Sequence, residues 1–194
     1  MILPPVFAYD EALLFWVAFV WAFIPEIRHS GLLAGDPGNR QDAGTLRLIN
    51  IASGIALALA FVASFIPWLT IPFPRLALYA GTALLIAGNL LRRYCFRTLG
   101  KYFTATVCVK ADQPVIDKGP YRWIRHPGYA AGFIMYLGIG LAFGSGLSLL
   151  IFFLMIWLVY SRRISAEEKA LLEVIGEPYR LYMEHTKRFI PFVV

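Results

Sequence analysis

Long uncharged runs separated by short charged stretches dominate the chain. Uncharged residues fill 48–74 and 76–91, and no charge occurs from Pro127 to Ser161. A transmembrane helix needs about 20 predominantly apolar residues and rises about 1.5 Å per residue, so the last run is too long for one crossing. Gly144-Ser145-Gly146 lies at its middle, where it favours a chain reversal. The pattern therefore predicts a tight hairpin of two spans.

Five transmembrane helices follow from these runs. We predict spans at about residues 6–27, 47–72, 75–96, 127–143 and 147–163. The first of them rests on the shorter uncharged stretch 12–24, extended past Asp10 and Glu11. The remaining polar material falls in segments 97–126 and 164–194. The fold class is therefore an all-α integral membrane protein with one domain, 1–194, a helical hairpin near the C-terminus and an amphipathic C-terminal helix.

Composition and charge agree with a membrane protein and give it an orientation. Hydrophobic residues make up 59% of the chain and charged residues 15%, with a mean hydropathy of +0.64, whereas a soluble domain carries about 25% charged residues. Of the 18 Lys and Arg residues, only Arg75 falls on the same side as the N-terminus. The positive-inside rule places the N-terminus outside and the C-terminus in the cytoplasm. The net charge of +6 thus reflects orientation and does not indicate nucleic-acid binding.

The first polar segment ends in a dense cluster of aromatic and basic residues, 118–129. Pro127 is expected to open the next helix, so Arg125 and His126 would lie at a helix N-terminus at the membrane surface. Free backbone N–H groups there favour binding of a carboxylate. The alternative is an interfacial belt of Tyr, Trp and Arg that anchors the span. The residues alone are equally compatible with both interpretations.

The second cluster follows the last span. Apolar positions three and four residues apart predict an amphipathic helix from Tyr160 to about Tyr182. Arg163 and Glu167 are one helical turn apart, and a surface ion pair is their simplest interpretation. The functional alternative is that opposite charges at the membrane surface bind a zwitterion together with an anionic group.

Other kinds of chemistry find little support. Cys95, Cys108 and three scattered histidines lack the spacing of a metal site. The sequence contains no Gly-x-Gly-x-x-Gly dinucleotide motif and no Gly-x-Ser-x-Gly nucleophile elbow. Charges are almost absent from the predicted spans, which argues against an ion pathway or a proton relay.

Taken together, the two clusters resemble the isoprenylcysteine carboxyl methyltransferase family. The resemblance covers roughly residues 75–194 and is specific, because its motifs occur in the right order around a helical hairpin. The chain is expected to be a short member of prokaryotic type. The matching positions are Gly119-Pro120-Tyr121, Arg125-His126-Pro127-x-Tyr129, Glu167-Glu168-x-x-Leu171, Gly176-x-x-Tyr179-x-x-Tyr182 and Arg188-Phe189-Ile190-Pro191.

The resemblance implies an integral membrane methyltransferase that uses S-adenosylmethionine and releases S-adenosylhomocysteine. The implied acceptor is lipophilic, such as the carboxylate of a prenylcysteine-like compound, and enters from the bilayer. The resemblance assigns Arg125, Arg163 and Glu168 to catalysis and acceptor binding, without deciding which of Glu167 and Glu168 contacts the cofactor. The implied cofactor-binding residues are Gln113, Val115, Gly119, Tyr121, His126, Tyr129, Glu167 and Leu171.

The chemistry of the acceptor separates the remaining alternatives. A carboxylate is ionised at pH 7 and needs no general base, only a cation such as Arg to orient it. An amine must lose a proton, which would make Glu167 or Glu168 a base. A phospholipid or other lipid N-methyltransferase is therefore the alternative enzyme. An NADPH-dependent enzyme similar to sterol reductases and a non-catalytic membrane scaffold represent two further classes.

Overall fold

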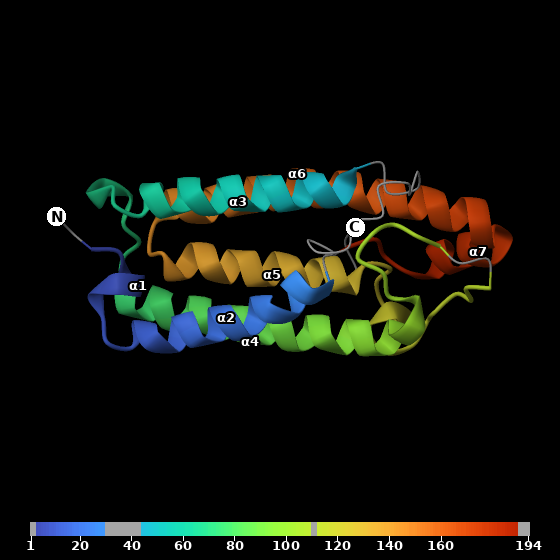
Figure 1. Cartoon of the computed structure of the whole chain (residues 1–194), viewed down its shortest axis with the longest axis horizontal. Coiled ribbons are helices and arrows are strands. Elements are labelled where there is room, and N and C mark those ends of the chain that lie inside the picture. Colours follow the sequence, from blue (N-terminus) through green and yellow to red (C-terminus); the bar gives the residue numbers. More distant parts are fainter. Residues whose placement is uncertain (1–2, 30–43, 110–111, 190–194) are drawn as a thin grey trace.

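The computed structural model describes residues 3–29, 44–109 and 112–189, which fold into helices, with a long connection between α4 (Pro74–Leu99) and α5 (Pro127–Ala142) (Figure 1). Within these ranges no strand forms, and only two isolated bridges pair Thr70 with Ser145 and Ile124 with Lys187. The fold class is all-α, as predicted. The α-helices are α1 (Pro5–Ala8), α2 (Ala12–His29), α3 (Thr45–Ala63), α4 (Pro74–Leu99), α5 (Pro127–Ala142), α6 (Gly146–Ile175) and α7 (Glu177–His185). Three short 3-10 turns are η1 (Pro67–Leu69), η2 (Gly100–Tyr102) and η3 (Gly119–Arg122).

Three of the described helices are long and apolar enough to cross a membrane. They are α3, α4 continued through η2, and α6, while α2 and α5 carry shorter apolar stretches at Ala12–Ile24 and Pro127–Ala142. Helix α6 is 30 residues long, so it runs from the last apolar segment straight into the second polar cluster. The predicted amphipathic helix is thus mainly a continuation of the last span. The chain is an integral membrane protein.

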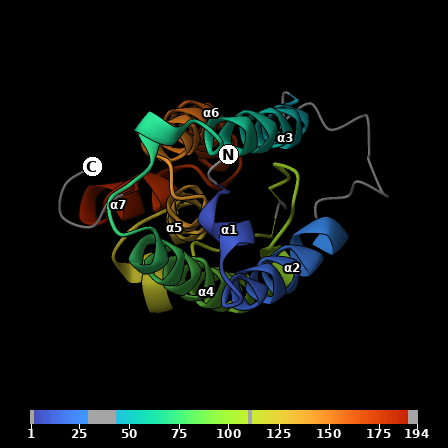
Figure 2. The same cartoon turned by 90° about the vertical axis from the view of Figure 1, so that its left-hand side faces the viewer.

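The five long helices pack in the order α3, α6, α5, α4, α2, each against the next. Figure 2 shows that this row curls, so that α3 and α2 lie at its two ends. The short helix α1 packs against α2 and α4. Because the row curls, its two end helices, α3 and α2, lie on the same side of the bundle.

Helices α4 and α5 approach each other most closely because glycines face each other across the contact. A Cβ on Gly81 would lie 2.5 Å from the backbone nitrogen of Ala142 and would also collide with the carbonyl oxygen of Gly138. Two turns further along, a Cβ on Gly88 would lie 2.9 Å from the carbonyl oxygen of Ala131. Small residues allow such close packing in membranes, where lipid provides no hydrophobic driving force between helices. This contact carries the end of α4 and the start of α5 to the same end of the bundle.

The turn between α5 and α6 lies where the sequence places it. Gly144 has a φ of 71°, a left-handed conformation that favours glycine. Ser145 caps α6 by accepting a hydrogen bond from the backbone N–H of Ser148. The hydroxyl of Ser148 then donates to the carbonyl oxygen of Ala60 across 2.6 Å, which ties α6 to α3.

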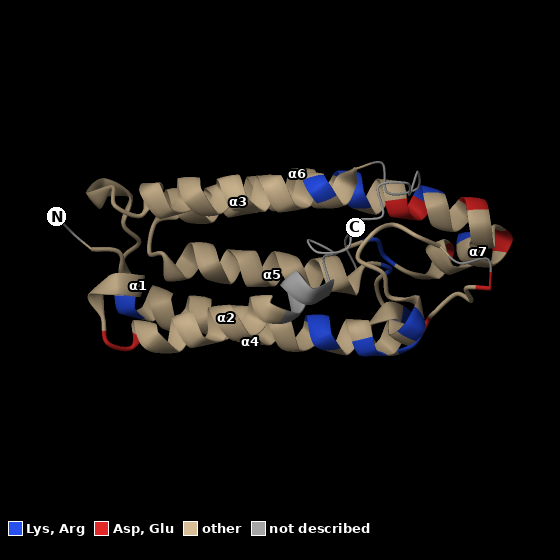
Figure 3. Cartoon of the chain, viewed as in Figure 1, with Lys and Arg blue, Asp and Glu red and all other residues tan. Residues whose placement is uncertain are grey.

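Charged residues gather at the end of the bundle that holds η2, η3, α7 and the C-terminal half of α6 (Figure 3). Only a small group lies at the opposite end among the described residues, where Arg75 stacks on Tyr9 at 4.7 Å and Tyr79 donates to Glu11 across 3.1 Å. This distribution agrees with the count of Lys and Arg residues on the two sides of the predicted spans. The assignment of the charged end to the cytoplasm stays a prediction from the positive-inside rule.

Candidate active site

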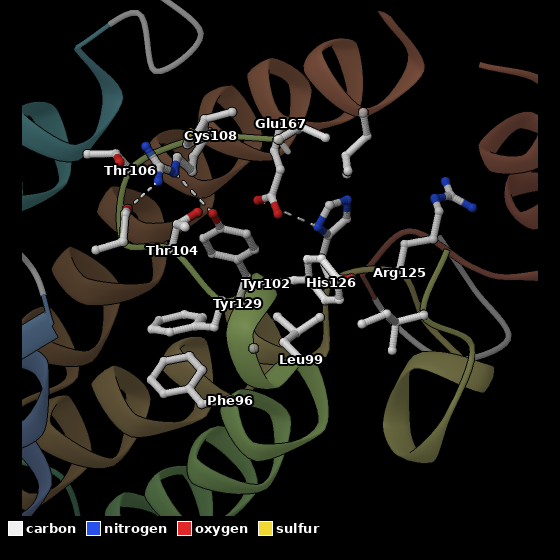
Figure 4. Close-up of a pocket in the computed structure, with 18 of the residues that line it drawn as sticks. Phe96, Leu99, Tyr102, Thr104, Thr106, Cys108, Arg125, His126, Tyr129 and Glu167 are labelled. Atoms are coloured by element: carbon white, nitrogen blue, oxygen red, sulfur yellow. Dashed lines mark hydrogen bonds and ion pairs between the residues drawn. The ribbon is translucent and has the colours of Figure 1, made fainter. Parts of the chain in front are cut away.

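A cavity of about 280 Å³ lies at the charged end of the bundle. Its wall combines residues of α2 to α7 with the connection between α4 and α5. The volume is close to the lower limit for small-molecule sites, which measure about 300–1,000 Å³. Figure 4 shows side chains from distant parts of the sequence, among them Phe96, His126 and Glu167, around one common space.

Most of the residues predicted from the sequence line this cavity. Gly119 and Glu168 are the exceptions, since neither is among the described residues of the wall. Gly119 has a φ of 57° and shapes the turn before η3, where a Cβ would lie 2.9 Å from the hydroxyl of Tyr94. Its place in the motif is therefore explained by the turn. The predicted residues that line the cavity are Gln113, Val115, Tyr121, Arg125, His126, Tyr129, Arg163, Glu167 and Leu171.

His126 lies between the two glutamates of α6. Its Nε2 atom is 3.2 Å from Oε1 of Glu168, and its Nδ1 atom is 4.0 Å from Oε2 of Glu167. The ring is buried, and His126 is the N-cap residue of α5, directly before Pro127 at the start of the helix. The side chain of Glu167 is 31% exposed and that of Glu168 only 10%. Figure 4 shows the carboxylate of Glu167 at the cavity, turned toward His126.

Arg125 and Glu168 form an ion pair, each with 10% of its side chain exposed, that contacts the C-terminal part of the chain. The Nε atom of Arg125 donates to Oε1 of Glu168 across 3.0 Å, and its Nη1 atom donates to the carbonyl oxygens of Met183 and Thr186. Arg188 lies 2.9 Å from Oε2 of Glu168. Figure 4 shows the guanidinium of Arg125 pointing away from the other labelled residues. These contacts favour a positioning role for both residues over the direct contact with the acceptor that the resemblance implies.

Arg163 is 3% exposed and lines the cavity from α6. Its Nε atom donates to the hydroxyl of Tyr129 across 3.0 Å. Its Nη1 atom donates to Oγ1 of Thr45 across 2.6 Å, and its Nη2 atom donates to the carbonyl oxygen of Ala105 across 2.5 Å. A buried guanidinium needs such partners, because desolvation of its charge is otherwise costly. The burial excludes the interpretation of Arg163 as half of a solvated surface ion pair.

Arg92 and Tyr160 were missed by the sequence analysis and line the cavity from α4 and α6. The Nη1 atom of Arg92 donates to the carbonyl oxygen of Gly128 across 2.7 Å. A Cβ on Gly132 would lie 2.6 Å from the hydroxyl of Tyr160 and 3.3 Å from Nη1 of Arg92. Gly132 therefore keeps space between these two polar groups. The one feature of the sequence that could have pointed to Arg92 as a cavity residue was its position as the first charge after an uncharged run.

Two tyrosines form the wall near η3 and α7. The hydroxyl of Tyr182 donates to the carbonyl oxygen of Tyr121 across 2.5 Å. Burial raises the pKa of both hydroxyl groups, so both stay protonated at neutral pH. They serve as neutral groups of the wall and not as bases.

Comparisons with known proteins agree with the geometry. The model of the isoprenylcysteine carboxyl methyltransferase family matches residues 81–173. The chain is similar to a probable protein-S-isoprenylcysteine O-methyltransferase of Oryza sativa subsp. indica, with 29% identity over 169 residues that cover 84% of this chain and 87% of the rice protein. It is also similar to the protein-S-isoprenylcysteine O-methyltransferase of Saccharomyces cerevisiae, with 34% identity over 121 residues, or 61% of this chain and 51% of the yeast protein.

A solved structure shares the fold. It is that of the eukaryotic intramembrane Ras methyltransferase, isoprenylcysteine carboxyl methyltransferase, with a TM-score of 0.65 and 22% identity over 97% of this chain and 80% of that one. The shared fold and the long apolar helices define an integral membrane protein, and the rice and yeast relatives are named methyltransferases. Over residues 81–173 the chain is similar to the isoprenylcysteine carboxyl methyltransferase family, in agreement with the resemblance of its two motif clusters. The alternatives, a lipid N-methyltransferase and an NADPH-dependent reductase, are not favoured.

Proposed function

We propose that the protein transfers the methyl group of S-adenosylmethionine to the carboxylate of a prenylcysteine-like lipophilic compound. The observation that carries this proposal is a single cavity with two kinds of wall. Gln113 and Glu167 belong to its polar end, whereas Phe23 and Ile49 come from the apolar stretches of α2 and α3. A water-soluble donor and a lipophilic acceptor can therefore meet in it. The acceptor class is the one in the names of the rice and yeast relatives.

The residues of the polar end fit S-adenosylmethionine. The partly exposed carboxylate of Glu167 suits the α-amino group, because a charge-assisted hydrogen bond is short and strong. Val115, Ile116 and Leu171 provide apolar surface for the adenine ring. Gly132 lines the same cavity, and its lack of a Cβ leaves room there for the hydroxyl of Tyr160 and the guanidinium of Arg92. When bound, the cofactor supplies a methyl group that is already activated by the sulfonium.

Arg163 is suited to orient the acceptor carboxylate. Thr45 and Tyr129 hold its guanidinium in place, so the positive charge is fixed before the acceptor arrives. Arg92, which projects from α4, adds a second positive charge to the deep part of the cavity. The acceptor carboxylate is ionised at neutral pH, and no side chain has to remove a proton. The protein then aligns the two reactants and excludes water.

Two measurements on the purified protein test this function. Titration with S-adenosylhomocysteine and, separately, with NADPH is expected to show binding of the first ligand only. Methyl-labelled S-adenosylmethionine is expected to label S-farnesyl-N-acetylcysteine as a base-labile ester. The same compound with a carboxamide in place of the carboxylate is the control and should stay unlabelled. Binding of NADPH, or transfer to amine headgroup lipids in place of the carboxylate, would contradict the proposal.

A further inference from the structure

His126 presents one ring nitrogen to each of two neighbouring carboxylates. Its Nε2 atom lies 3.2 Å from Oε1 of Glu168, and its Nδ1 atom lies 4.0 Å from Oε2 of Glu167. Successive residues of an α-helix project about 100° apart, so the two carboxylates reach the ring from different directions. Figure 4 shows the ring of His126 and the carboxylate of Glu167 facing each other at the cavity. The two nitrogens of the ring therefore have different surroundings.

The carboxylate of Glu168 determines which nitrogen carries the hydrogen. The Nε atoms of Arg125 and Arg188 lie 3.0 and 2.9 Å from its two oxygens. Two guanidinium groups at these distances favour the ionised form of a carboxyl group. An ionised carboxylate can only accept hydrogen bonds. The hydrogen between Glu168 and His126 must therefore lie on Nε2 of the ring.

The other nitrogen, Nδ1, faces Glu167 at the cavity. Glu167 lines the cavity and has 31% of its side chain exposed. With one hydrogen on Nε2, a neutral imidazole has a lone pair on Nδ1. His126 thus has two states: a neutral ring whose Nδ1 accepts a hydrogen bond, and a cation whose Nδ1 donates toward Glu167. The remaining tautomer would place the lone pair of Nε2 against Glu168.

Apart from the two carboxylates, the charged and titratable groups around the ring keep their charge between pH 5 and 8. Guanidinium groups stay protonated, and burial raises the pKa of Tyr121 on η3 and Tyr179 on α7. Histidine is the side chain whose charge ordinarily changes in this range. The ring of His126 therefore links this part of the cavity to pH. The groups around it are Arg125, Arg188, Tyr129 of α5, Arg163 of α6, Tyr121 and Tyr179.

The spacing of the two acceptors suits an ammonium group. S-adenosylmethionine carries an α-ammonium with three N–H donors, as a lysine side chain does. A nitrogen about 2.8 Å from each acceptor can bridge the 4.0 Å between Nδ1 of His126 and Oε2 of Glu167. A proton on Nδ1 would remove one acceptor and place a second positive charge beside the ammonium. The proton and the ammonium therefore compete for the same place.

We infer that Glu168 is a positioning residue that keeps the hydrogen of His126 on Nε2, so that Nδ1 and Glu167 together accept the α-ammonium group of the cofactor. This inference rests on the proposed function. Cofactor binding then requires the neutral ring, and acidification weakens binding because it protonates Nδ1. Glu168 acts on the cofactor only through His126, since it is not among the described residues of the cavity wall.

The pH dependence of binding by the wild-type protein tests this inference. S-adenosylhomocysteine has the same α-amino group, and calorimetric titration should show its affinity at pH 5.5 at least about fivefold below that at pH 7.5. Heats in buffers of different ionisation enthalpy should show that binding at pH 6 releases protons. The deamino analogue, in which a hydrogen replaces the α-amino group, lacks the cation. Its affinity should change by less than about twofold over the same range.

The variant His126→Gln removes the titrating nitrogen and keeps an N–H donor for Glu168. Affinity for S-adenosylhomocysteine should then change by less than about twofold between pH 7.5 and 5.5. This result also separates His126 from a titration of Glu167, which would persist in the variant. The matched control is His185→Gln on α7, since His185 is exposed and its Nδ1 atom lies 2.8 Å from the carbonyl oxygen of Leu181. It should retain the wild-type pH dependence.

The variant Glu168→Gln tests the positioning step. An amide can turn its N–H toward Nε2, which moves the ring hydrogen to Nδ1. Affinity for S-adenosylhomocysteine at pH 7.5 should fall at least about threefold, in the range of one hydrogen bond, while that for the deamino analogue stays within about twofold. A general loss of the site would weaken both ligands alike. If this variant does not fold, the pH series of the wild type and of His126→Gln decide the inference.

The outcomes distinguish the two proposals. The inference is overturned if the affinity for S-adenosylhomocysteine does not change with pH, if the deamino analogue shows the same change, or if the change persists in His126→Gln. Absence of S-adenosylhomocysteine binding by the wild-type protein at any pH would contradict the proposed function instead.

Discussion

The Nε atom of Arg163 donates a hydrogen bond to the hydroxyl of Tyr129 across 3.0 Å and so links α6 to α5 inside the cavity wall. Thr45 accepts from the same guanidinium and adds α3 to this link. A planar guanidinium can serve several fixed partners at once, whereas a lysine ammonium is a compact point charge on a flexible stem. The site therefore depends on the shape of this cation as well as on its charge.

The variant Arg163→Lys tests that dependence. Affinity for S-adenosylhomocysteine should stay within about threefold, while methyl transfer to a prenylcysteine acceptor should fall at least about tenfold, or about 1.4 kcal/mol in the barrier. Calorimetry and transfer of a labelled methyl group measure the two effects. The exposed neighbour provides the control Arg162→Lys, which should behave like the wild type. Turnover that is indifferent to Arg163→Lys would count against the carboxylate-binding role.

Glu167→Gln keeps the shape of the side chain and removes its charge. Cofactor affinity should weaken by about 1.5–3 kcal/mol, the usual contribution of a hydrogen bond to a charged group. Calorimetric titration with S-adenosylhomocysteine measures the change. Glu173→Gln is the matched control on the same helix, since the side chain of Glu173 is 62% exposed. If the affinity is unchanged, Glu167 is only a structural neighbour of His126.

Glu168→Gln should act on stability. Its carboxylate is the shared partner of Arg125, His126 and Arg188, and loss of one member of a buried charge pair costs about 3–5 kcal/mol. Thermal unfolding in detergent should therefore show a clearly lower Tm for Glu168→Gln than for Glu167→Gln. Equal Tm values for the two variants would argue against an anchoring role of Glu168.

The contact between α4 and α5 predicts a contrast between two glycines. Gly81→Ala forces a Cβ into the backbone of α5 and should destabilise the fold by about 1–3 kcal/mol, the usual cost of overpacking. On α3, a Cβ on Gly54 would have no neighbour within 4 Å. Gly54→Ala should leave the Tm unchanged or raise it, because alanine has the higher helix propensity. Similar Tm values for both variants would contradict the close approach of the two helices.

The orientation in the membrane can be tested with one added cysteine. Trp68 is 84% exposed in the connection between α3 and α4, and Trp68→Cys should react with an impermeant maleimide from outside sealed cells. The native Cys108 is exposed near the opposite end, whereas Cys95 is buried. Cys108 should react only after permeabilisation and serves as an internal control. The reverse pattern would place the charged end outside.

Local signals in the sequence explain which parts of the fold were predictable. The turn at Gly144 follows from a glycine in the middle of an uncharged run that is too long for one crossing. The predicted second span, 47–72, extends beyond the helix itself, because α3 ends at Ala63 and Pro67 starts a separate turn. A proline cannot continue the hydrogen-bond ladder of a helix. Hydrophobicity alone does not reveal this difference, since the residues after Ala63 are still apolar.

The site was predictable only where its residues lie in two compact motifs. His126 and Glu167 belong to them, and the structure brings them together. Thr45 was not recognised, because its hydrogen bond to Arg163 joins residues 118 positions apart and depends on the packing of α3 against α6. Arg92 was interpreted as a residue at the end of a span. Its role depends on the glycines that let α4 approach α5, which is a property of the pair of helices.

The two walls of the cavity also have a kinetic consequence. A lipophilic acceptor reaches the protein from a two-dimensional phase, the bilayer, whereas a water-soluble donor arrives from the aqueous volume. The supply of acceptor is then set by its mole fraction in the bilayer and not by its bulk molarity. Added inert lipid or detergent dilutes the acceptor at the protein even when the total amount stays constant, while the donor concentration is unaffected. Rates obtained at different lipid-to-protein ratios are thus comparable only on a surface-concentration scale.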